Sequence, residues 1–528
     1  MGEQELFTLA VAIAVVVIAG RVIADRLDVP EAIVLVVLGV LASLVPQVPN
    51  IRLPPDVVLL LFLPPLVYNA AFFSAPRETK ENAVPISALA VGTTAVTILG
   101  VAAVTRLLLP ELGWAPSLAF AAAVAPTDAV AATSVLTKLG APQRIVTIIE
   151  GESLINDGVA LTAFGLAVEA MSHPFTMGHI VMRLAEVVVG GVAYGLVVAV
   201  VIGRVRRYVR DPSIQILITL MTPFIAYIPA EQLDVSGVLA TVVTGVYLGT
   251  RAEGMLQPAS RVSGTMFWRT LVFLLESALF VLLGLELRTV AGDLSNTHSI
   301  AWLAGAAAAE VAVVIVIRMA WELLVSPLIS LLPGRHSSYV RNPWRQRLVV
   351  GWGGMRGAIS LAIALTLPLT VGGHPFTERP TLIFLASVVV VVTLIGEGLT
   401  FAPLLRVLGL VMHQEHRERE ARARTQVIEA GLARIDEMAE AEEVDEDTAN
   451  VYRQLFEMRL DRARATLEDE DDEDGEGARH FDMTAFRAEL VRAERAKLAQ
   501  LYQDRKVTDE IRRSISRTLD MQERRGFG

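Results

Sequence analysis

Residues 120–158 read FAAAVAPTDAVAATSVLTKLGAPQRIVTIIEGESLINDG, two apolar segments that carry groups which hydrocarbon rejects. The polar or helix-breaking residues inside them are Pro126, Thr127, Asp128, Glu150, Glu152, Asn156 and Asp157. A charged side chain at the centre of a bilayer costs roughly 2.5–3.5 kcal/mol on insertion scales. Several carboxylates kept in two adjacent apolar segments therefore indicate an aqueous or ion-lined site, and we predict the functional centre here.

The composition of the whole chain places these segments in a membrane. Of 528 residues, 53% are hydrophobic and only 19% are charged, and the mean hydropathy is positive. A soluble protein of this size is less apolar, so we predict an all-α polytopic membrane protein. The chain has no cysteine, which excludes disulfides and thiolate metal sites.

A membrane-spanning helix needs about 20 mostly apolar residues. Counting such windows predicts about 13 transmembrane helices. They lie near 5–24, 30–46, 56–73, 84–109, 116–137, 144–171, 178–203, 212–229, 235–250, 263–287, 299–326, 346–370 and 380–411. The first is preceded by an acidic leader and lacks a small-residue cleavage site, so we predict a retained span rather than a signal peptide.

The charges between the spans predict the orientation. Lys and Arg gather in one set of alternate loops, such as 204–210 and 335–345, whereas the other set has few of them. Positively charged loops face the cytoplasm. We therefore predict an N-terminus outside and a C-terminal tail in the cytoplasm.

A second region begins near His413, where Glu, Arg, Ala and Gln replace the apolar composition. We predict two domains, a transmembrane domain over 1–412 and a cytoplasmic tail over 413–528. The acidic run near 467–477 should be disordered through self-repulsion. The flanking pieces, 415–465 and 479–524, have apolar residues at helical spacing. A regulatory or assembly tail and a ligand-binding domain are both conceivable, and no motif supports the second.

Pro126 stands in the middle of an apolar helix, where it removes one backbone hydrogen bond and clashes with the preceding turn. Such breaks survive in membranes only inside protein or beside a water-filled cavity. Bare carbonyls beside Asp128 would suit a small cation. Alternatively, this is a plain kink in which Asp128 caps the second half-helix. The two interpretations are compatible.

In the next span, helical periodicity places Glu150, Ser153 and Asp157 on nearly one face, with Glu152 and Asn156 in a row beside it. Oxygen ligands of this kind suit a hard cation. A structural role remains the alternative for both acids: Asp157 could be a salt-bridged carboxylate, and Glu152 could pair with a buried base.

Residues 349–368 read VVGWGGMRGAISLAIALTLP, in which glycines that include Gly353 and Gly354 loosen the helix around Arg356. An unpaired arginine at that depth is costly, so we predict that Arg356 holds a carboxylate. Two interrupted segments in corresponding places of two halves predict an inverted repeat with a binding site where they cross.

Further intramembrane polar residues are Asn69, Glu186, Glu276, Glu310, Arg318, Glu322 and Glu397. Each is a functional candidate by default. Glu310, Arg318 and Glu322 are close enough on one helix to pair locally. We predict a structural role for most of this set.

These residues resemble the cation:proton antiporter-1 family, which contains NhaP-type sodium/proton antiporters and animal sodium/proton exchangers. The resemblance rests on APTDAVA at 125–131, GESLINDG at 151–158, GGMRGAISLA at 353–362 and LPPLVYNAAF at 63–72. It covers about 1–412 and is closest to the bacterial form, which places the protein in the plasma membrane. The family implies a homodimer with a dimerisation region and a core region that holds two crossed, unwound helices.

The resemblance also implies roles for individual residues. Asp157 would bind cation and proton alternately, Asp128 and the Thr127 main chain would line the site, and Ser153 would add a ligand. Asn156 would support the site.

Two further implications concern its surroundings. Glu152 would pair with Arg356. In archaeal relatives an acid stands where this chain has Asn69, so a direct ligand role there is in doubt, and a neutral ligand or a helix contact remains open.

The implied function is secondary exchange of a monovalent cation, most simply Na⁺, for H⁺, serving pH and sodium homeostasis. Asn156 occupies the place of a second acid in electrogenic relatives, so the resemblance implies electroneutral 1:1 exchange. A K⁺ or mixed-cation antiporter and a cation channel are the alternatives. We find no catalytic Ser/His pair or zinc motif, and expect no enzymatic activity, no cofactor and no nucleic-acid partner.

Overall fold

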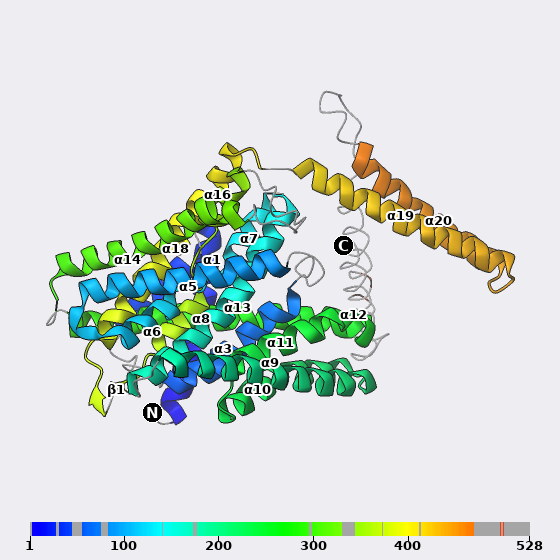
Figure 1. Cartoon of the computed structure of the whole chain (residues 1–528). Helices are drawn as coiled ribbons and strands as arrows, with labels where there is room; N and C mark the ends of the chain where they lie inside the picture. The colour runs from blue at the N-terminus through cyan, green and yellow to red at the C-terminus, as the bar shows by residue number, and fades with distance from the viewer. Residues whose placement is uncertain are drawn as a thin grey trace. The chain divides into compact units, whose positions relative to one another are not determined.

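The computed structural model describes residues 3–27, 31–44, 55–74, 83–139, 141–172, 177–294, 298–329, 344–371, 373–410 and 413–468, together with the isolated positions 497 and 500. The chain divides into two compact units, Met1–His416 and Arg417–Gly528. The first is a bundle of helices, and the described part of the second is helical (Figure 1).

A helix, or a pair of interrupted helices, occupies each predicted span. The helices of the first unit are α1 (Glu3–Leu27), α2 (Glu31–Ser43), α3 (Pro55–Phe73), α5 (Ala83–Leu108), α6 (Trp114–Val124), α7 (Ala129–Lys138), α8 (Gln143–Ser172), α9 (Met177–Tyr208), α10 (Pro212–Gln232), α11 (Gly237–Thr250), α12 (Ala252–Met255), α13 (Pro258–Leu294), α14 (Ile300–Ala320), α15 (Ser326–Ile329), α16 (Trp344–Trp352), α17 (Ala358–Leu365) and α18 (Arg379–Val407). A 3₁₀ turn, Pro110–Leu112, precedes α6, and a π-helical turn, Trp321–Val325, follows α14.

Both predicted interruptions are present. The span predicted at 116–137 is α6 and α7, and the backbone between them is not helical. The span predicted at 346–370 ends at Leu365 as α16 and α17, which are separated by a second unwound link. After α17 the chain forms a two-residue hairpin, β1 (Thr370–Val371) and β2 (His374–Pro375), before α18 begins.

The helices around the breaks form the interior of the bundle. The helix α8 packs against α5, α6, α7 and α16, and α17 packs against α3, α6 and α18. A neighbouring group pairs α11 with α3, α9 and α10, and α13 with α2. The residues between Ala119 and Val124 in α6 are essentially inaccessible to solvent. The first break therefore lies in a fully packed environment.

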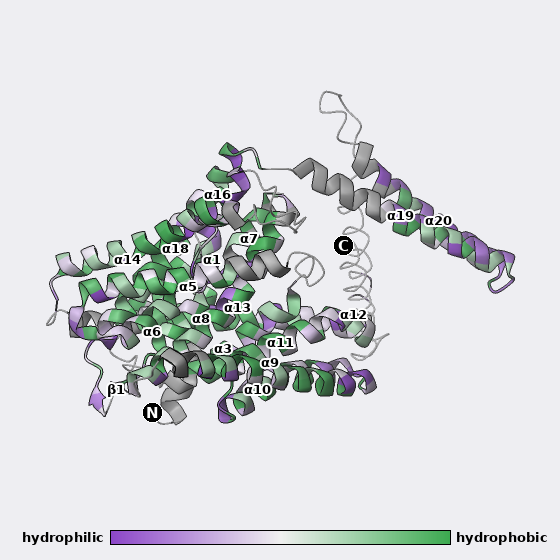
Figure 2. Ribbon diagram, viewed as in Figure 1, coloured by the Kyte–Doolittle hydropathy of each residue, from purple (hydrophilic) through white to green (hydrophobic). Residues whose placement is uncertain are grey.

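Hydrophobic residues predominate along the helices of this unit (Figure 2), and many of them are exposed. Seven of the described helices are long and apolar enough to cross a membrane, and four shorter ones are apolar as well. Exposed residues such as Leu99, Val189 and Val316 are more than half accessible although they are large and hydrophobic. Such a surface is stable against hydrocarbon rather than water.

The second unit contains most of α19 (His413–Glu440) and all of α20 (Glu446–Glu468). Arg453 of α20 pairs with Asp436 of α19 at 2.7 Å, and Arg464 pairs with Glu429 at 3.0 Å. The predicted 415–465 piece is thus a helical hairpin rather than one helix. Most of the predicted acidic run at 467–477 and, apart from positions 497 and 500, the piece at 479–524 lie outside the described residues.

Candidate functional site: two broken helices beside a buried carboxylate

The unwound link between α6 and α7 is held by side chains from other helices. Pro126 interrupts the helix, and the backbone of residues 125–128 is not helical. The carbonyls of residues 124–127 therefore need partners from outside the helix. Each of them has one. The four donors are Arg356 Nε to Val124 O (3.3 Å), Asn156 Nδ2 to Ala125 O (3.4 Å), Ser360 Oγ to Pro126 O (3.1 Å) and Ser153 Oγ to Thr127 O (2.6 Å). Donors from α8, α17 and the second link therefore fix the first link.

The two links also touch directly. The Asp128 amide donates to the Met355 carbonyl at 2.6 Å. Gly357 is required at this contact, because a Cβ there would overlap the Asp128 carboxylate. Gly354 is required for a second reason, since a Cβ there would overlap the Arg318 side chain. A Cβ on Gly353 would lie 3.0 Å from Ile149 Cδ1, which is also a tight approach. The glycine-rich segment thus lets a carboxylate and an arginine approach the backbone.

Asp157 lies on α8 next to the crossing and is 3% exposed. Its Oδ1 atom is buried and has no hydrogen-bond partner among the described residues. A buried carboxylate oxygen normally has a partner, because an unpaired one is costly. An unpaired oxygen at this position is therefore a place where a proton or a cation can bind.

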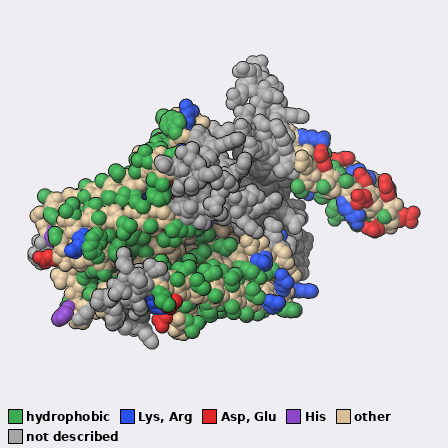
Figure 3. All heavy atoms as spheres, viewed as in Figure 1, with side chains coloured by type: hydrophobic (Ala, Val, Ile, Leu, Met, Phe, Trp, Pro, Cys, Tyr) green, Lys and Arg blue, Asp and Glu red, His purple; other side chains and the backbone are tan. Residues whose placement is uncertain are grey.

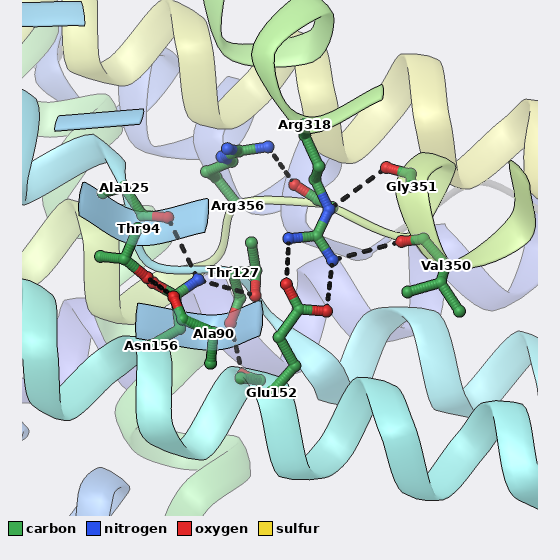
Figure 4. A network of polar contacts seen from close by, with 12 residues as sticks. Ala90, Thr94, Ala125, Thr127, Glu152, Asn156, Arg318, Val350, Gly351 and Arg356 are labelled. Atoms are coloured by element: carbon green, nitrogen blue, oxygen red, sulfur yellow. Dashed lines mark hydrogen bonds and ion pairs between the residues drawn. The ribbon is translucent and has the colours of Figure 1, made fainter. Parts of the chain in front are cut away.

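Asn156, the neighbour of Asp157 on α8, joins three elements. Its Nδ2 donates to the Thr127 hydroxyl at 3.3 Å as well as to Ala125 O, and its Oδ1 accepts from the Thr94 hydroxyl of α5 (Figure 4). Asn156 is thus satisfied by protein on both ends of its amide. The sequence did not single out Thr94, since a threonine in an apolar helix is unremarkable by pattern alone.

A cavity of about 170 Å³ lies beside these residues. Its polar lining includes Asn69, Thr127, Asp128, Glu150, Ser153, Asp157, Glu276 and Ser360. The predicted face of Glu150, Ser153 and Asp157 therefore points into one cavity, and Asn69 joins it from α3. Asn156 is not part of the lining. Glu276, from α13, was predicted to be structural, and no spacing in the sequence could have connected it with α8.

A buried ion pair lies next to the crossing but away from the cavity. The Arg318 guanidinium donates to both Glu152 carboxylate oxygens, at 2.8 and 3.1 Å, and each side chain is at most 3% exposed. Arg318 also donates to the carbonyls of Gly351 and Val350, each at 3.2 Å (Figure 4). Every acceptor is therefore part of the interior, and the pair ties α14 to α8 and α16.

The predicted pairing of Glu152 with Arg356 is wrong, because Arg318 takes both carboxylate oxygens. The Arg356 side chain instead donates to the carbonyls of Val124 and Gly354, one in each link. Nor does Arg318 pair with Glu310 on its own helix, since Glu310 Oε1 accepts from Thr105 at 2.8 Å. A backbone break supplies carbonyl acceptors, and the Arg356 side chain donates to these rather than to Glu152.

The arrangement can bind a small hard cation. Carboxylate, hydroxyl, amide and carbonyl oxygens converge on one cavity, and such ligands suit alkali and alkaline-earth ions. Among the described residues, no three His, Cys, Asp or Glu side chains cluster as a resident metal site would require.

Comparisons with known proteins agree with this arrangement. Residues 11–407 match the family described as sodium/hydrogen exchanger, transmembrane. The chain is 30% identical to an uncharacterised Na⁺/H⁺ exchanger of Mycobacterium tuberculosis over 99% of this chain and 97% of the relative. It is 30% identical to the low-affinity Na⁺/H⁺ antiporter NhaS1 of Synechocystis over 84% of this chain and 81% of the relative.

A solved structure has the same fold. The sodium proton antiporter MjNhaP1 of Methanocaldococcus jannaschii superposes with a TM-score of 0.59 over 77% of this chain and all of that one, at 18% identity. The predicted antiporter fold is confirmed by this likeness.

Proposed function

Because the chain belongs to the sodium/hydrogen exchanger family, we propose that it is a secondary antiporter that exchanges Na⁺ for H⁺, with both ions competing for Asp157. The observation that carries the assignment to Asp157 is its buried, unpartnered Oδ1 beside an oxygen-lined cavity. The relatives are named as exchangers of these two ions.

The exchange follows from the cost of burying a charge. An empty Asp157 carboxylate in a water-poor interior is expensive, whereas a protonated or Na⁺-loaded one is locally neutral. The loaded forms can therefore cross between the two sides of the membrane, and the empty form crosses reluctantly. Binding of Na⁺ expels the proton and binding of the proton expels Na⁺, which couples the two fluxes.

The neighbours of Asp157 have different tasks in this proposal. Thr127, Asp128 and Ser153 supply further oxygens in the cavity, and Asn69 offers a neutral one. Asn156 fixes the unwound link relative to α8 and α5. Arg356 and the Glu152–Arg318 pair stabilise the crossing without contacting the cation.

We further propose that the exchange is electroneutral, with one Na⁺ per H⁺. In this scheme Asp157 is the exchanging acid, and its neighbour Asn156 cannot take up a second proton. We place the protein in the cell membrane as a homodimer, with the N-terminus outside and the second unit in the cytoplasm. The first unit carries transport in this assignment, and the second regulates or assembles it.

The experiment is a proton flux measurement in proteoliposomes that contain a pH-sensitive dye. A Na⁺ gradient should move protons, and clamping the membrane potential with K⁺ and valinomycin should leave rate and endpoint unchanged. An electrogenic exchanger would respond with about 2.3 kcal/mol per charge per 100 mV. A current carried by the cation without proton movement would instead identify a channel.

The same assay determines the cation. Cavity size and ligand number decide among hard cations. Replacing Na⁺ by Li⁺, with choline as an inert control, gives the relative rates, and K⁺ is tested without valinomycin. A rate with K⁺ equal to that with Na⁺ would identify the mixed-cation antiporter.

A further inference from the structure

A second cavity, of about 220 Å³, lies in the first unit near the ends of α3, α9 and α10 and the beginning of α13. It shares only Phe73 with the lining of the first cavity. The lining residues that matter here are Phe72, Arg206, Gln215, Ser260, Arg261 and Trp268. Antiport at Asp157 uses none of them.

Arg206 is the centre of this cavity and is only 3% exposed. Its Nε donates to Gln215 Oε1 at 2.9 Å, and Gln215 Nε2 donates to the carbonyls of Arg206 and Val209, both at 2.7 Å. The guanidinium also lies 5.9 Å from the centre of the Phe72 ring. These contacts hold the arginine rigidly with its charge directed inward.

Among the described residues, Arg206 forms no ion pair with an acid. Its Nη1 is buried and without a hydrogen-bond partner, as is the Oγ of Ser260, which lines the same cavity. The described residues of the lining include a second arginine, Arg261, and no acid. Burying a charge without an opposite one costs several kcal/mol, so a guanidinium held by neutral partners with Nη1 still unbonded indicates that the cavity receives an anion.

The donors are those that recognise a phosphate group. Guanidinium presents parallel N–H groups that match phosphate oxygens, and it retains its charge at all physiological pH values. The hydroxyl of Ser260 and a second arginine, Arg261, which donates to the Leu256 carbonyl, line the same cavity. The volume is several times what one water molecule needs, which leaves room for a phosphate group and part of the molecule that carries it.

The surroundings resemble those of a lipid headgroup. Exposed arginines flank Arg206 on the same end of the bundle, namely Arg204, Arg207 and Arg210. Large exposed apolar residues follow the arginines on α9, namely Val205 and Tyr208, and Val262 and Met266 stand beside the lining residues Arg261 and Thr265 on α13. Figure 3 shows several Lys and Arg side chains at one edge of a face on which hydrophobic side chains are numerous. Headgroups of anionic lipids are bound at such boundaries by basic pockets between helices.

We propose that this cavity is a binding site for a phosphate ester, with Arg206 as its central ligand and an anionic phospholipid as the source. The lipid phosphate would neutralise Arg206, and the acyl chains would lie along the exposed apolar residues. The site would thereby link the stability of the transporter to the charge of its membrane.

The test is thermal unfolding of the full-length protein in detergent, followed by tryptophan fluorescence. The micelles are supplemented with phosphatidylcholine, with phosphatidylglycerol, or with sodium phosphate at matched ionic strength. Phosphatidylglycerol should raise the midpoint of the wild type by on the order of 2–5 °C, whereas phosphatidylcholine should not. A shift with sodium phosphate that equals the shift with phosphatidylglycerol would assign the site to free phosphate.

Variants distinguish the cavity from general surface charge. Arg206→Gln should lose the shift, while the control Arg207→Gln, which removes an exposed arginine one position away, should keep it. In phosphatidylcholine alone Arg206→Gln should unfold near the wild-type midpoint, because the loss of the contacts with Gln215 and Phe72 offsets the removal of a buried charge. Ser260→Ala should reduce the shift if Arg206→Gln does not fold. The proposal is overturned if no phosphate compound raises the wild-type midpoint, or if Arg206→Gln responds as the wild type does.

Discussion

Two carboxylates on α8, Glu152 and Asp157, are equally buried and differ in what meets them. Both oxygens of Glu152 accept from Arg318, whereas Asp157 Oδ1 has no partner in the described part of the chain. Glu152 therefore has a permanent counter-charge and Asp157 can have a temporary one. The difference shows that burial alone does not identify a transport site. Whether a buried carboxylate can bind an ion depends on whether the protein already supplies it with a partner.

Asp157→Asn is the change with the largest expected effect on transport. Asparagine cannot exchange a proton, so Na⁺-driven proton flux should fall to the level of empty liposomes. Because the substitution removes a buried charge whose Oδ1 is unpartnered, the unfolding midpoint should stay within ~2 °C of the wild type or rise. Proton flux and thermal unfolding measure the two effects separately.

Glu169→Gln is the matched control for this variant. Glu169 is another acid of α8 but is partly exposed, and its nearest base, Arg183, lies 3.6 Å away. The Glu169→Gln variant should exchange Na⁺ for H⁺ at the wild-type rate. If Asp157→Asn did so too, the assignment of the exchanging residue would be wrong.

Glu152→Gln should have the largest effect on stability. It removes the carboxylate to which Arg318 donates at 2.8 and 3.1 Å, and breaking a buried pair in this way costs about 3–5 kcal/mol. The double variant Glu152→Leu/Arg318→Met removes both charges and should regain most of this stability, as apolar replacements of buried pairs often do. Chemical unfolding of the single and double variants in detergent measures the difference.

Removing Arg183 from its partly exposed pair with Glu169 provides the reference, since such pairs contribute about 0–1 kcal/mol. A double variant no more stable than Glu152→Gln would contradict the view that the pair is a structural tie.

Thr94→Val tests whether Asn156 has a purely structural role, as the Glu152–Arg318 pair does, or whether it supports cation binding at Asp157. The substitution keeps the shape of the side chain and removes the hydroxyl that donates to Asn156 Oδ1. We expect a stability loss of about 1–2 kcal/mol and a several-fold higher KM for Na⁺, because the amide would no longer hold the unwound link in place. The conservative Thr94→Ser should restore the KM. A changed stability with an unchanged KM would make Asn156 purely structural.

The sequence reveals the breaks but not the partners. Pro126 and the glycines near Arg356 act on their own backbone, so a short stretch of sequence is enough to predict the interruptions they cause. The pairing of Glu152 with Arg318 joins residues 166 positions apart. Arg356 also stands in an apolar segment, so the sequence alone could not decide which arginine is the partner of Glu152. The position of Glu276 in the cavity likewise depends on how α13 packs. Distances between helices are set by packing, which no local pattern encodes.

The smallest expected effect concerns a third carboxylate, Asp445, which is satisfied by hydrogen bonds in water. It accepts from the Thr448 amide at 2.7 Å and from the Thr448 hydroxyl at 2.8 Å, where α20 begins. These bonds favour the charged form and hold the pKa of Asp445 below its usual value. The stabilisation is therefore complete above the unfolded pKa of ~3.9 and is lost as the pH falls through the lower folded value.

Hydrogen exchange of the α20 amides should show the loss of this cap. Asp445→Asn should speed exchange in the first turn at pH 5, and the wild type should approach the variant as the pH is lowered below ~3.9. The control Glu457→Gln, in the middle of α20, should leave the first turn unchanged. Equal protection in Asp445→Asn and the wild type at pH 5 would refute the cap. Because Asp445 is solvated, the loss of stability in Asp445→Asn should stay small. The larger loss expected for Glu152→Gln then measures how much burial increases the contribution of a hydrogen-bonded carboxylate to stability.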